Sequence, residues 1–71
     1  MNKLYEILKK IHPEYDFRNS ENYIADGLLD SLDIITLIDD IEQEFGVAID
    51  GMDIVPENFS NAQVIMGLIN K

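Results

Sequence analysis

Residues 26–33 (Asp-Gly-Leu-Leu-Asp-Ser-Leu-Asp) bring one hydroxyl and several carboxylates together at the expected start of a helix. Either Asp30 or Ser31 has a side chain that can cap this helix. With Asp30 as the N-cap, Asp33 stands at the third helical position, where an acid completes a capping box. With Ser31 as the N-cap, an isoleucine takes that position and completes nothing. The register with Asp30 as the cap is therefore favoured.

This register leaves the hydroxyl of Ser31 free at the first helical position. Backbone N–H groups and the helix dipole favour a phosphate at such a place. The carboxylates of Asp30 and Asp33 would repel a phosphodiester unless a divalent cation or basic residues of another protein screened them. Spacing alone therefore leaves two interpretations open, a phosphate-bearing serine and an ordinary helix-start serine.

Two amphipathic helices must hold this segment in place. Residues 2–11 have apolar side chains at helical spacing, and Pro13 ends the helix because the residue before a proline disfavours the helical conformation. Residues 30–45 carry the strongest helical pattern, which ends at Gly46, a residue that readily takes the left-handed conformation. The apolar positions of these two helices are Leu4, Ile7, Leu8 and Ile11, and Ile34, Leu37, Ile38, Ile41 and Phe45.

The other segments predict a long loop, a short helical turn and a last helix. Residues 12–29 have no sustained period, and a loop of this length in a small domain is often functional. One helical turn is expected near residues 53–58. Ser60 and Gln63 match a capping box, with Phe59 and Val64 as its hydrophobic staple, and predict a helix that continues to the end of the sequence.

The predicted fold is all-α, with three main helices, one short helix and a long first loop, in a single domain of residues 1–71. No segment alternates like a strand over a useful length. The residues expected in the core are Leu4, Ile7, Leu8, Ile11, Leu32, Ile35, Ile38, Ile41, Phe45, Val64, Ile65 and Leu68, with Leu29 and Ile54 added.

The charge pattern excludes several classes of partner. The formal net charge is −9, and residues 19–70 contain no Lys or Arg while most of the 14 acids lie there. Such a surface repels nucleic-acid backbones and anionic membranes but attracts basic protein surfaces. The N-terminal residues lack the apolar stretch of a signal peptide, and no run is long enough to span a bilayer, so we expect a cytoplasmic protein.

Other chemistries find little support in the sequence. There is no cysteine, which excludes disulfides, thiolate metal sites and cysteine catalysis. His12 is the only histidine, no acid or serine is tied to it by spacing, and we expect a solvated residue at a helix end. A calcium loop that begins at Asp50 fails because Met52 and Ile54 occupy positions where oxygen ligands are needed.

The tripeptide Asp30-Ser31-Leu32 changes the balance between the two interpretations of the serine. It lies within Gly-Leu-Leu-Asp-Ser-Leu-Asp (27–33) and is followed by a helix that closes in Glu-Gln-Glu-Phe-Gly (42–46). Together with the preceding helix, the long loop and the final capped helix, this order resembles the acyl carrier protein family over nearly the whole chain. The resemblance implies a helical acyl or peptidyl carrier.

The resemblance also implies a prosthetic group and a set of enzyme partners. Ser31 would carry covalent 4′-phosphopantetheine, with Asp30 and Leu32 as its motif neighbours, and a phosphopantetheinyl transferase would take the arm from coenzyme A with a divalent metal. Acyl or aminoacyl ligases, transferases or condensing enzymes of fatty acid, polyketide or nonribosomal peptide synthesis would then use the thiol of the arm as a thioester carrier. The protein itself would be a stand-alone, monomeric shuttle with no catalytic activity and no intrinsic metal.

The second helix is implied to dock against basic patches on these enzymes. The docking candidates are Asp33, Thr36, Asp39, Asp40, Glu42 and Glu44. Carriers of fatty acid synthesis usually have an acid where this chain has Thr36 and an apolar residue where it has Asp39. The Gly-Leu-Leu-Asp-Ser approach is more similar to carriers of peptide, D-alanyl or specialised acyl pathways. The alternative is an acidic helical adaptor that never receives a prosthetic group.

Overall fold

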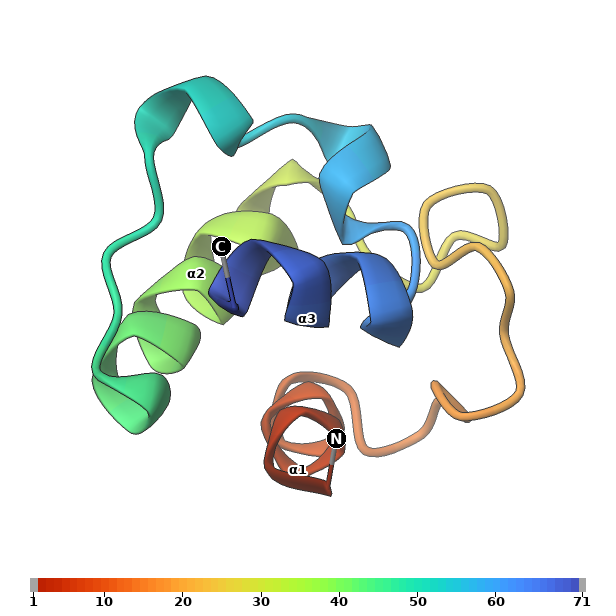
Figure 1. The fold of residues 1–71 in the computed structure, drawn as a ribbon. Coiled ribbons are helices and arrows are strands. Elements are labelled where there is room, and N and C mark those ends of the chain that lie inside the picture. Colours follow the sequence, from red (N-terminus) through yellow and green to blue (C-terminus); the bar gives the residue numbers. More distant parts are fainter. Residues whose placement is uncertain (1, 71) are drawn as a thin grey trace.

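The structure, a computed structural model, describes residues 2–70 and consists there of helices and connecting segments without strands. Three α-helices, α1 (Asn2–Ile11), α2 (Ser31–Phe45) and α3 (Ala62–Ile69), are joined by a long first loop and by two 3-10 turns, η1 (Gly51–Asp53) and η2 (Pro56–Phe59). Helix α1 lies across α2 and α3, and η2 packs against both of these helices (Figure 1). The all-α prediction is confirmed. None of the helices in this part of the chain is long and apolar enough to cross a membrane.

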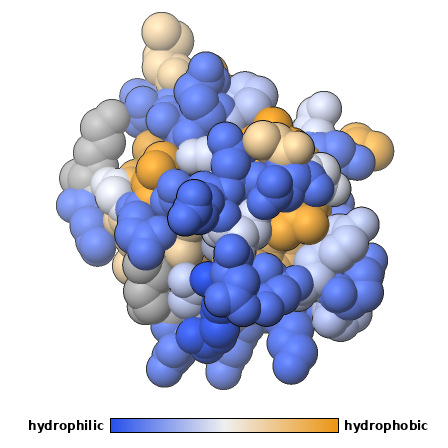
Figure 2. Space-filling model, turned by 90° about the vertical axis from the view of Figure 1, so that its right-hand side faces the viewer, coloured by the Kyte–Doolittle hydropathy of each residue, from blue (hydrophilic) through white to orange (hydrophobic). Residues whose placement is uncertain are grey.

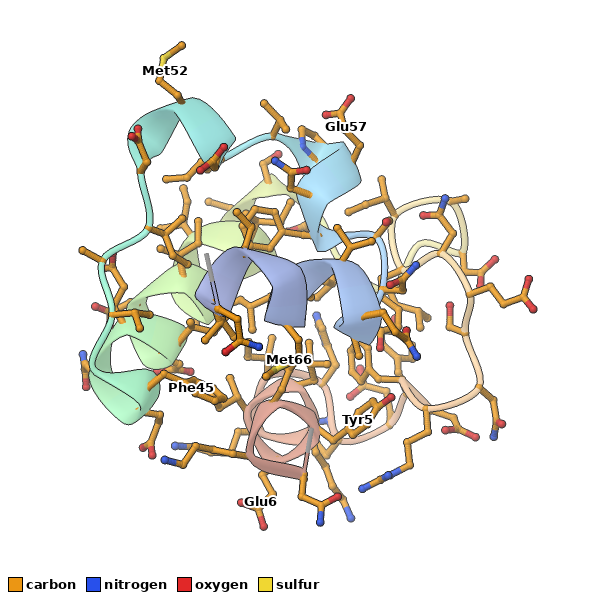
Figure 3. All side chains as sticks on the ribbon, in the orientation of Figure 1. Tyr5, Glu6, Phe45, Met52, Glu57 and Met66 are labelled. Atoms are coloured by element: carbon orange, nitrogen blue, oxygen red, sulfur yellow. The ribbon has the colours of Figure 1, made fainter. Side chains whose placement is uncertain are left out.

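Helix α1 forms because its apolar residues share one face. Leu4, Ile7 and Leu8 are buried, whereas Tyr5 between them is half-buried and Glu6 is exposed. Lys9 and Lys10 lie in the last turn, where positive charge complements the negative end of the helix dipole. Met66 of α3 points toward α1 (Figure 3), so that the apolar face of α1 closes one side of the core.

Helix α2 buries a stripe that differs from the predicted core. Ile34, Leu37 and Ile41 face inward, but Leu32 and Ile35, both expected in the core, are 75% and 63% exposed. By helical periodicity, Leu32 and Ile35 lie on the other side of the helix from this stripe, where a threonine and an aspartate follow them. The buried side is the one that stays apolar along the whole helix, and α1 and η2 both pack against α2.

The C-terminal end of α2 is capped in two ways. Gly46 adopts the left-handed conformation (φ 66°), as predicted, and its N–H donates to the carbonyl oxygen of Glu42. The last turn contains no basic residue, but Lys3 of α1 donates from Nζ to the carbonyl oxygen of Glu44 at 2.9 Å. A cation from a different helix therefore compensates the negative end of α2.

The first loop is packed into the core instead of lying free on the surface. Phe17, Tyr23 and Leu29 are buried, and the rings of Phe17 and Tyr23 meet edge to face at 5.1 Å. The Tyr23 hydroxyl donates to the Phe17 carbonyl oxygen at 2.7 Å, and the Tyr23 N–H donates to the Ser60 carbonyl oxygen at 2.6 Å. The carbonyl oxygen of Tyr23 in turn accepts from the N–H groups of Leu28 and Leu29. These hydrogen bonds of Tyr23 hold the last residues of the first loop in place before α2 begins.

The face on the side of this loop is mostly hydrophilic, with small separate hydrophobic areas (Figure 2).

The second half of the chain differs from the prediction in its turns and in its last cap. The expected single turn near residues 53–58 is divided into η1 and η2, and Ile54 between them is 39% exposed instead of belonging to the core. Asn61, not Ser60, is the N-cap of α3, because Asn61 is extended and its side chain accepts from the N–H of Val64 at 2.9 Å. Ser60 still has helical dihedral angles as the end of η2.

This later start of α3 also changes which residue enters the core. Val64, expected as part of a staple with Phe59, takes the third helical position and is 37% exposed. Ile65, at the fourth position, is fully buried, as is Phe59. The residues buried outside the predicted core are Phe17, Tyr23, Ile34, Leu37, Phe59, Ala62 and Ile69.

Candidate functional site

The start of α2 is held by a reciprocal pair of hydrogen bonds between two aspartates. Oδ1 of Asp30 accepts from the N–H of Asp33 at 2.9 Å, and Oδ2 of Asp33 accepts from the N–H of Asp30 at 3.1 Å. Asp30 has the extended backbone that an N-cap requires, so the predicted capping box is confirmed. Its consequence is that Ser31 becomes the first residue of α2.

Ser31 presents an exposed hydroxyl that takes no part in the structure of the helix start. The residue is exposed, and its side chain has no hydrogen-bond partner within residues 2–70. The backbone N–H groups of Ser31 and Leu32 belong to the first turn, where no intrahelical acceptor exists. These N–H groups and the helix dipole favour a negatively charged substituent close to the hydroxyl. A covalently attached phosphodiester fits this position.

An apolar groove of about 420 Å³ lies directly beside Ser31. It is formed where the first turn of α2, the end of the first loop and the segment between η1 and η2 meet. No local sequence pattern indicates this groove, because its walls come from three separate stretches of the chain. Its lining residues are Ile24, Leu29, Asp30, Ser31, Ile34, Ile35, Ile54, Val55 and Pro56.

His12 is in contact with the capping box, contrary to its expected role as a solvated helix-end residue. Its Nε2 lies 2.8 Å from Oδ2 of Asp33, and its Nδ1 lies 3.3 Å from Oε2 of Glu14. The side chains of His12 and Asp33 are 26% and 21% exposed. The sequence analysis found no acid tied to His12 by spacing. No local pattern joins residues that lie 21 positions apart, so only the packing of α1 on α2 brings them together.

The contact between His12 and Asp33 changes the pKa of both groups in opposite directions. The hydrogen bond to Asp33 raises the pKa of His12 above 6.5, against the opposing effect of partial burial. Partial burial opposes ionisation of Asp33, but hydrogen bonds from His12 and from the Asp30 N–H hold its pKa below 3.8. Because both ring nitrogens of His12 face carboxylate oxygens, the doubly protonated imidazolium fits this site best.

The predicted docking residues of α2 have different environments. The side chain of Asp39 accepts from Nε2 of Gln43 at 3.1 Å, and Oγ1 of Thr36 donates to the carbonyl oxygen of Leu32 at 3.3 Å. Oε2 of Glu42 accepts from the N–H of Ile49 at 2.9 Å and thereby holds the segment that follows α2. Of the six candidates, Thr36, Asp39 and Glu44 are exposed, and Asp33, Asp40 and Glu42 are half-buried.

Large apolar side chains stand exposed on the same side as the groove. Leu32 and Ile35 on the first turns of α2 flank the exposed hydroxyl, and Ile35 also lines the groove. Met52 on η1 is 86% exposed and projects away from the body of the protein (Figure 3). Clusters of exposed apolar side chains are typical of a surface that meets other proteins.

The acids do not assemble into a metal site in the part of the chain that the structure describes. Across residues 2–70, no group of three or more His, Asp or Glu side chains is arranged to hold a metal ion. Beside the exposed hydroxyl of Ser31 lie the two carboxylates of the capping box, and His12 contacts one of them.

Comparison with known proteins gives one match. A protein-family model described as "Phosphopantetheine attachment site" matches residues 6–68. This stretch contains Ser31 with its capping box, and His12. No curated protein and no solved structure matches the chain significantly.

Proposed function

The chain belongs to the phosphopantetheine attachment site family and is a carrier of covalent 4′-phosphopantetheine, and on this basis we propose that Ser31 is the attachment residue. The observation that carries the proposal is the exposed hydroxyl at the first position of α2, which the capping box leaves without a partner. Asp30 and Leu32 flank it, Asp30 as the cap that frees the serine and Leu32 as an exposed apolar neighbour.

The other two serines are less suitable acceptors. Oγ of Ser20 donates to Oδ2 of Asp26 at 2.6 Å, which engages this hydroxyl within the loop. Ser60 is half-buried where η2 meets α3, and its carbonyl oxygen accepts from the N–H of Tyr23. Neither serine precedes a long helix whose first N–H groups are available to a phosphate.

The attachment reaction needs little from this chain beyond an accessible hydroxyl. Oγ of Ser31 attacks the phosphorus next to the pantetheine in coenzyme A. The new Oγ–P bond forms while the P–O bond to adenosine 3′,5′-bisphosphate breaks, and the hydroxyl proton passes to a base of the transferase. Once attached, the arm supplies the thiol on which a cargo is held as a thioester, a group that this chain without cysteine does not provide.

The carrier role implies contact with a phosphopantetheinyl transferase and with biosynthetic enzymes. We propose that the exposed side of α2 forms this contact, with Leu32 and Ile35 as apolar anchors. The acidic candidates Asp39, Asp40 and Glu44 would meet basic residues at the rim. Such contacts favour fast, salt-sensitive association over long residence, which suits a non-catalytic shuttle that visits several enzymes. Glu42 would contribute charge while keeping its hydrogen bond to the Ile49 N–H, whereas the carboxylate of Asp33 is engaged by His12 and by the Asp30 N–H.

The carrier role leaves the pathway open, and only the thiol chemistry of the arm limits the class of cargo. An acyl or aminoacyl thioester is the expected load, and residues 1–71 are proposed to form one carrier unit. The groove beside Ser31 and the uncommon Thr36 and Asp39 on α2 are the features by which partner enzymes would distinguish this carrier from others.

Intact-mass spectrometry tests the attachment site directly. Purified protein is incubated with coenzyme A, Mg²⁺ and a broad-specificity phosphopantetheinyl transferase. The wild type and Ser20→Ala, the matched control, are expected to gain the mass of one arm, whereas Ser31→Ala gains none. An arm on Ser31→Ala would refute the proposed residue. A wild type that stays bare would refute attachment altogether and favour an acidic helical adaptor.

A charge reversal tests the docking surface. Asp39→Lys is expected to slow modification of Ser31 several-fold at low salt and to lose most of this effect at high salt. Glu21→Lys on the first loop, an exposed position away from α2, is the matched control and is expected to change the rate little. Equal rates for the two variants would contradict the proposed surface.

A further inference from the structure

We propose that His12 is a positioning residue for Ser31, because it anchors the capping box through Asp33 and offsets one of the two carboxylate charges beside the hydroxyl. The inference goes beyond the carrier role, and its kinetic part rests on the proposed function of Ser31. His12 lies at the start of the first loop, whereas Ser31 follows the end of this loop. The attachment reaction itself does not require His12.

The geometry that carries the inference is a single shared oxygen. Oδ2 of Asp33 accepts from the N–H of Asp30 at 3.1 Å and lies 2.8 Å from Nε2 of His12. His12 is the first residue after α1, and its N–H donates to the carbonyl oxygen of Leu8 at 3.0 Å, so the ring is held at the end of that helix. This one carboxylate oxygen thus connects the end of α1 to the N-cap of α2, the residue that directly precedes Ser31.

The surroundings of the ring determine its charge. Asp33 approaches from α2 and Glu14 from the first loop, while the ring of Tyr15 lies at a centroid distance of 5.0 Å. Both charged neighbours are carboxylates, and no Lys or Arg contacts the ring among the residues described. The arrangement therefore stabilises the imidazolium, and the hydrogen bond to Asp33 raises the pKa of His12.

The charge of His12 matters because the group that Ser31 accepts is anionic. Two carboxylates, Asp30 and Asp33, hold the helix start in shape but oppose the approach of a phosphodiester. A protonated His12 cancels one of these charges without giving up the hydrogen bond that Asp33 makes to the Asp30 N–H. When His12 loses its proton, the carboxylate of Asp33 is left uncompensated, and Ser31 should accept the arm more slowly.

NMR titration of the unmodified protein tests the anchoring. The ring of His12 and the amide of Ser31 are expected to share one inflection above pH 6.5. In Asp33→Asn the inflection of the ring should move to lower pH, and the Ser31 amide should lose its response. Glu14→Gln is the matched control, because it removes the longer contact to the same ring and should keep the coupling. A Ser31 amide that ignores the titration of His12 in the wild type would overturn the proposal.

The rate of modification tests the electrostatic part with the variant His12→Gln, which is neutral at every pH. The ratio of wild-type to variant rate cancels the pH dependence of the transferase itself. We expect a ratio of about two to five below the pKa of His12, the range of a partly exposed charge pair, falling toward one above it. A ratio that is constant with pH would assign His12 a merely structural role and overturn charge compensation. A wild type that accepts no arm at any pH would instead refute the attachment proposal, and the titration would still decide the anchoring.

Discussion

The hydroxyl of Tyr23 offers the sharpest test of how the first loop is held. Tyr23→Phe removes one oxygen atom and keeps the ring, so the edge-to-face contact with Phe17 is retained. The hydroxyl is its only polar group outside the backbone, and the residue is 1% exposed. The substitution therefore separates the polar interactions of the hydroxyl, with the Phe17 carbonyl oxygen and with the backbone of Ala62, from the packing of the ring.

The size of the effect follows from the acceptor that the substitution leaves behind. A net hydrogen bond contributes about 1 kcal/mol, and a buried carbonyl without a donor adds a desolvation cost, giving a loss of about 1–3 kcal/mol. A domain of this length has a free energy of unfolding of roughly 4–11 kcal/mol. Because each 1 kcal/mol lowers the midpoint of small domains by about 4–8 °C, we expect Tyr23→Phe to melt at least about 4 °C below the wild type.

Thermal and urea unfolding, followed by circular dichroism, measure this difference. Tyr15→Phe is the matched control, since Tyr15 lies on the same loop but is 38% exposed, and its loss of a hydroxyl should change stability by less than about 0.5 kcal/mol. If Tyr23→Phe were as stable as Tyr15→Phe, the hydrogen bond from the Tyr23 hydroxyl to the Phe17 carbonyl oxygen would not stabilise the loop.

The remaining predictions concern the core, a cap and alkaline pH. Ile41→Ala, at a fully buried position of α2, should lower the free energy of unfolding by about 2–5 kcal/mol. Ile35→Ala, on the exposed side of the same helix, should change it by less than about 0.5 kcal/mol. Urea unfolding compares the two variants. Gly46→Ala should cost about 1 kcal/mol by the same assay, because φ is 66° although the space for a Cβ is open. Burial raises the pKa of Tyr23 to about 12, so the unfolded chain loses this proton at lower pH than the folded protein. The free energy of unfolding should therefore fall as pH rises from about 10 to 12. Urea unfolding at several pH values would detect this loss of stability, which Tyr23→Phe should not show.

Local chemistry made the helix start predictable. The choice between Asp30 and Ser31 as the cap depends on which side chain stands three positions later, and that information lies within five consecutive residues. The same holds for Gly46, whose conformation follows from the lack of a side chain at the end of an amphipathic run. The cap and the place of Ser31 at the start of the helix were therefore assigned correctly from the sequence.

Packing decisions between distant segments were harder to predict. Leu32 and Ile35 were expected in the core although their side of α2 becomes polar at the next turn, and the structure leaves both exposed. Ser60 and Asn61 are both good caps, and the turn of η2 that ends at Ser60 decided between them. The contact between His12 and Asp33 could not be predicted from the spacing of these residues in the sequence.

The anchoring of Tyr23 has a consequence for how far this carrier can reach. The backbone of Tyr23 joins the first loop to the η2–α3 junction and to the residues just before α2. The segment that precedes Ser31 is therefore tied to the rest of the fold and does not act as a hinge. On the function proposed above, delivery of a cargo would then depend on the tether and not on a hinge below Ser31. Lengthening the loop upstream of Tyr23 should accordingly leave the span of delivery unchanged.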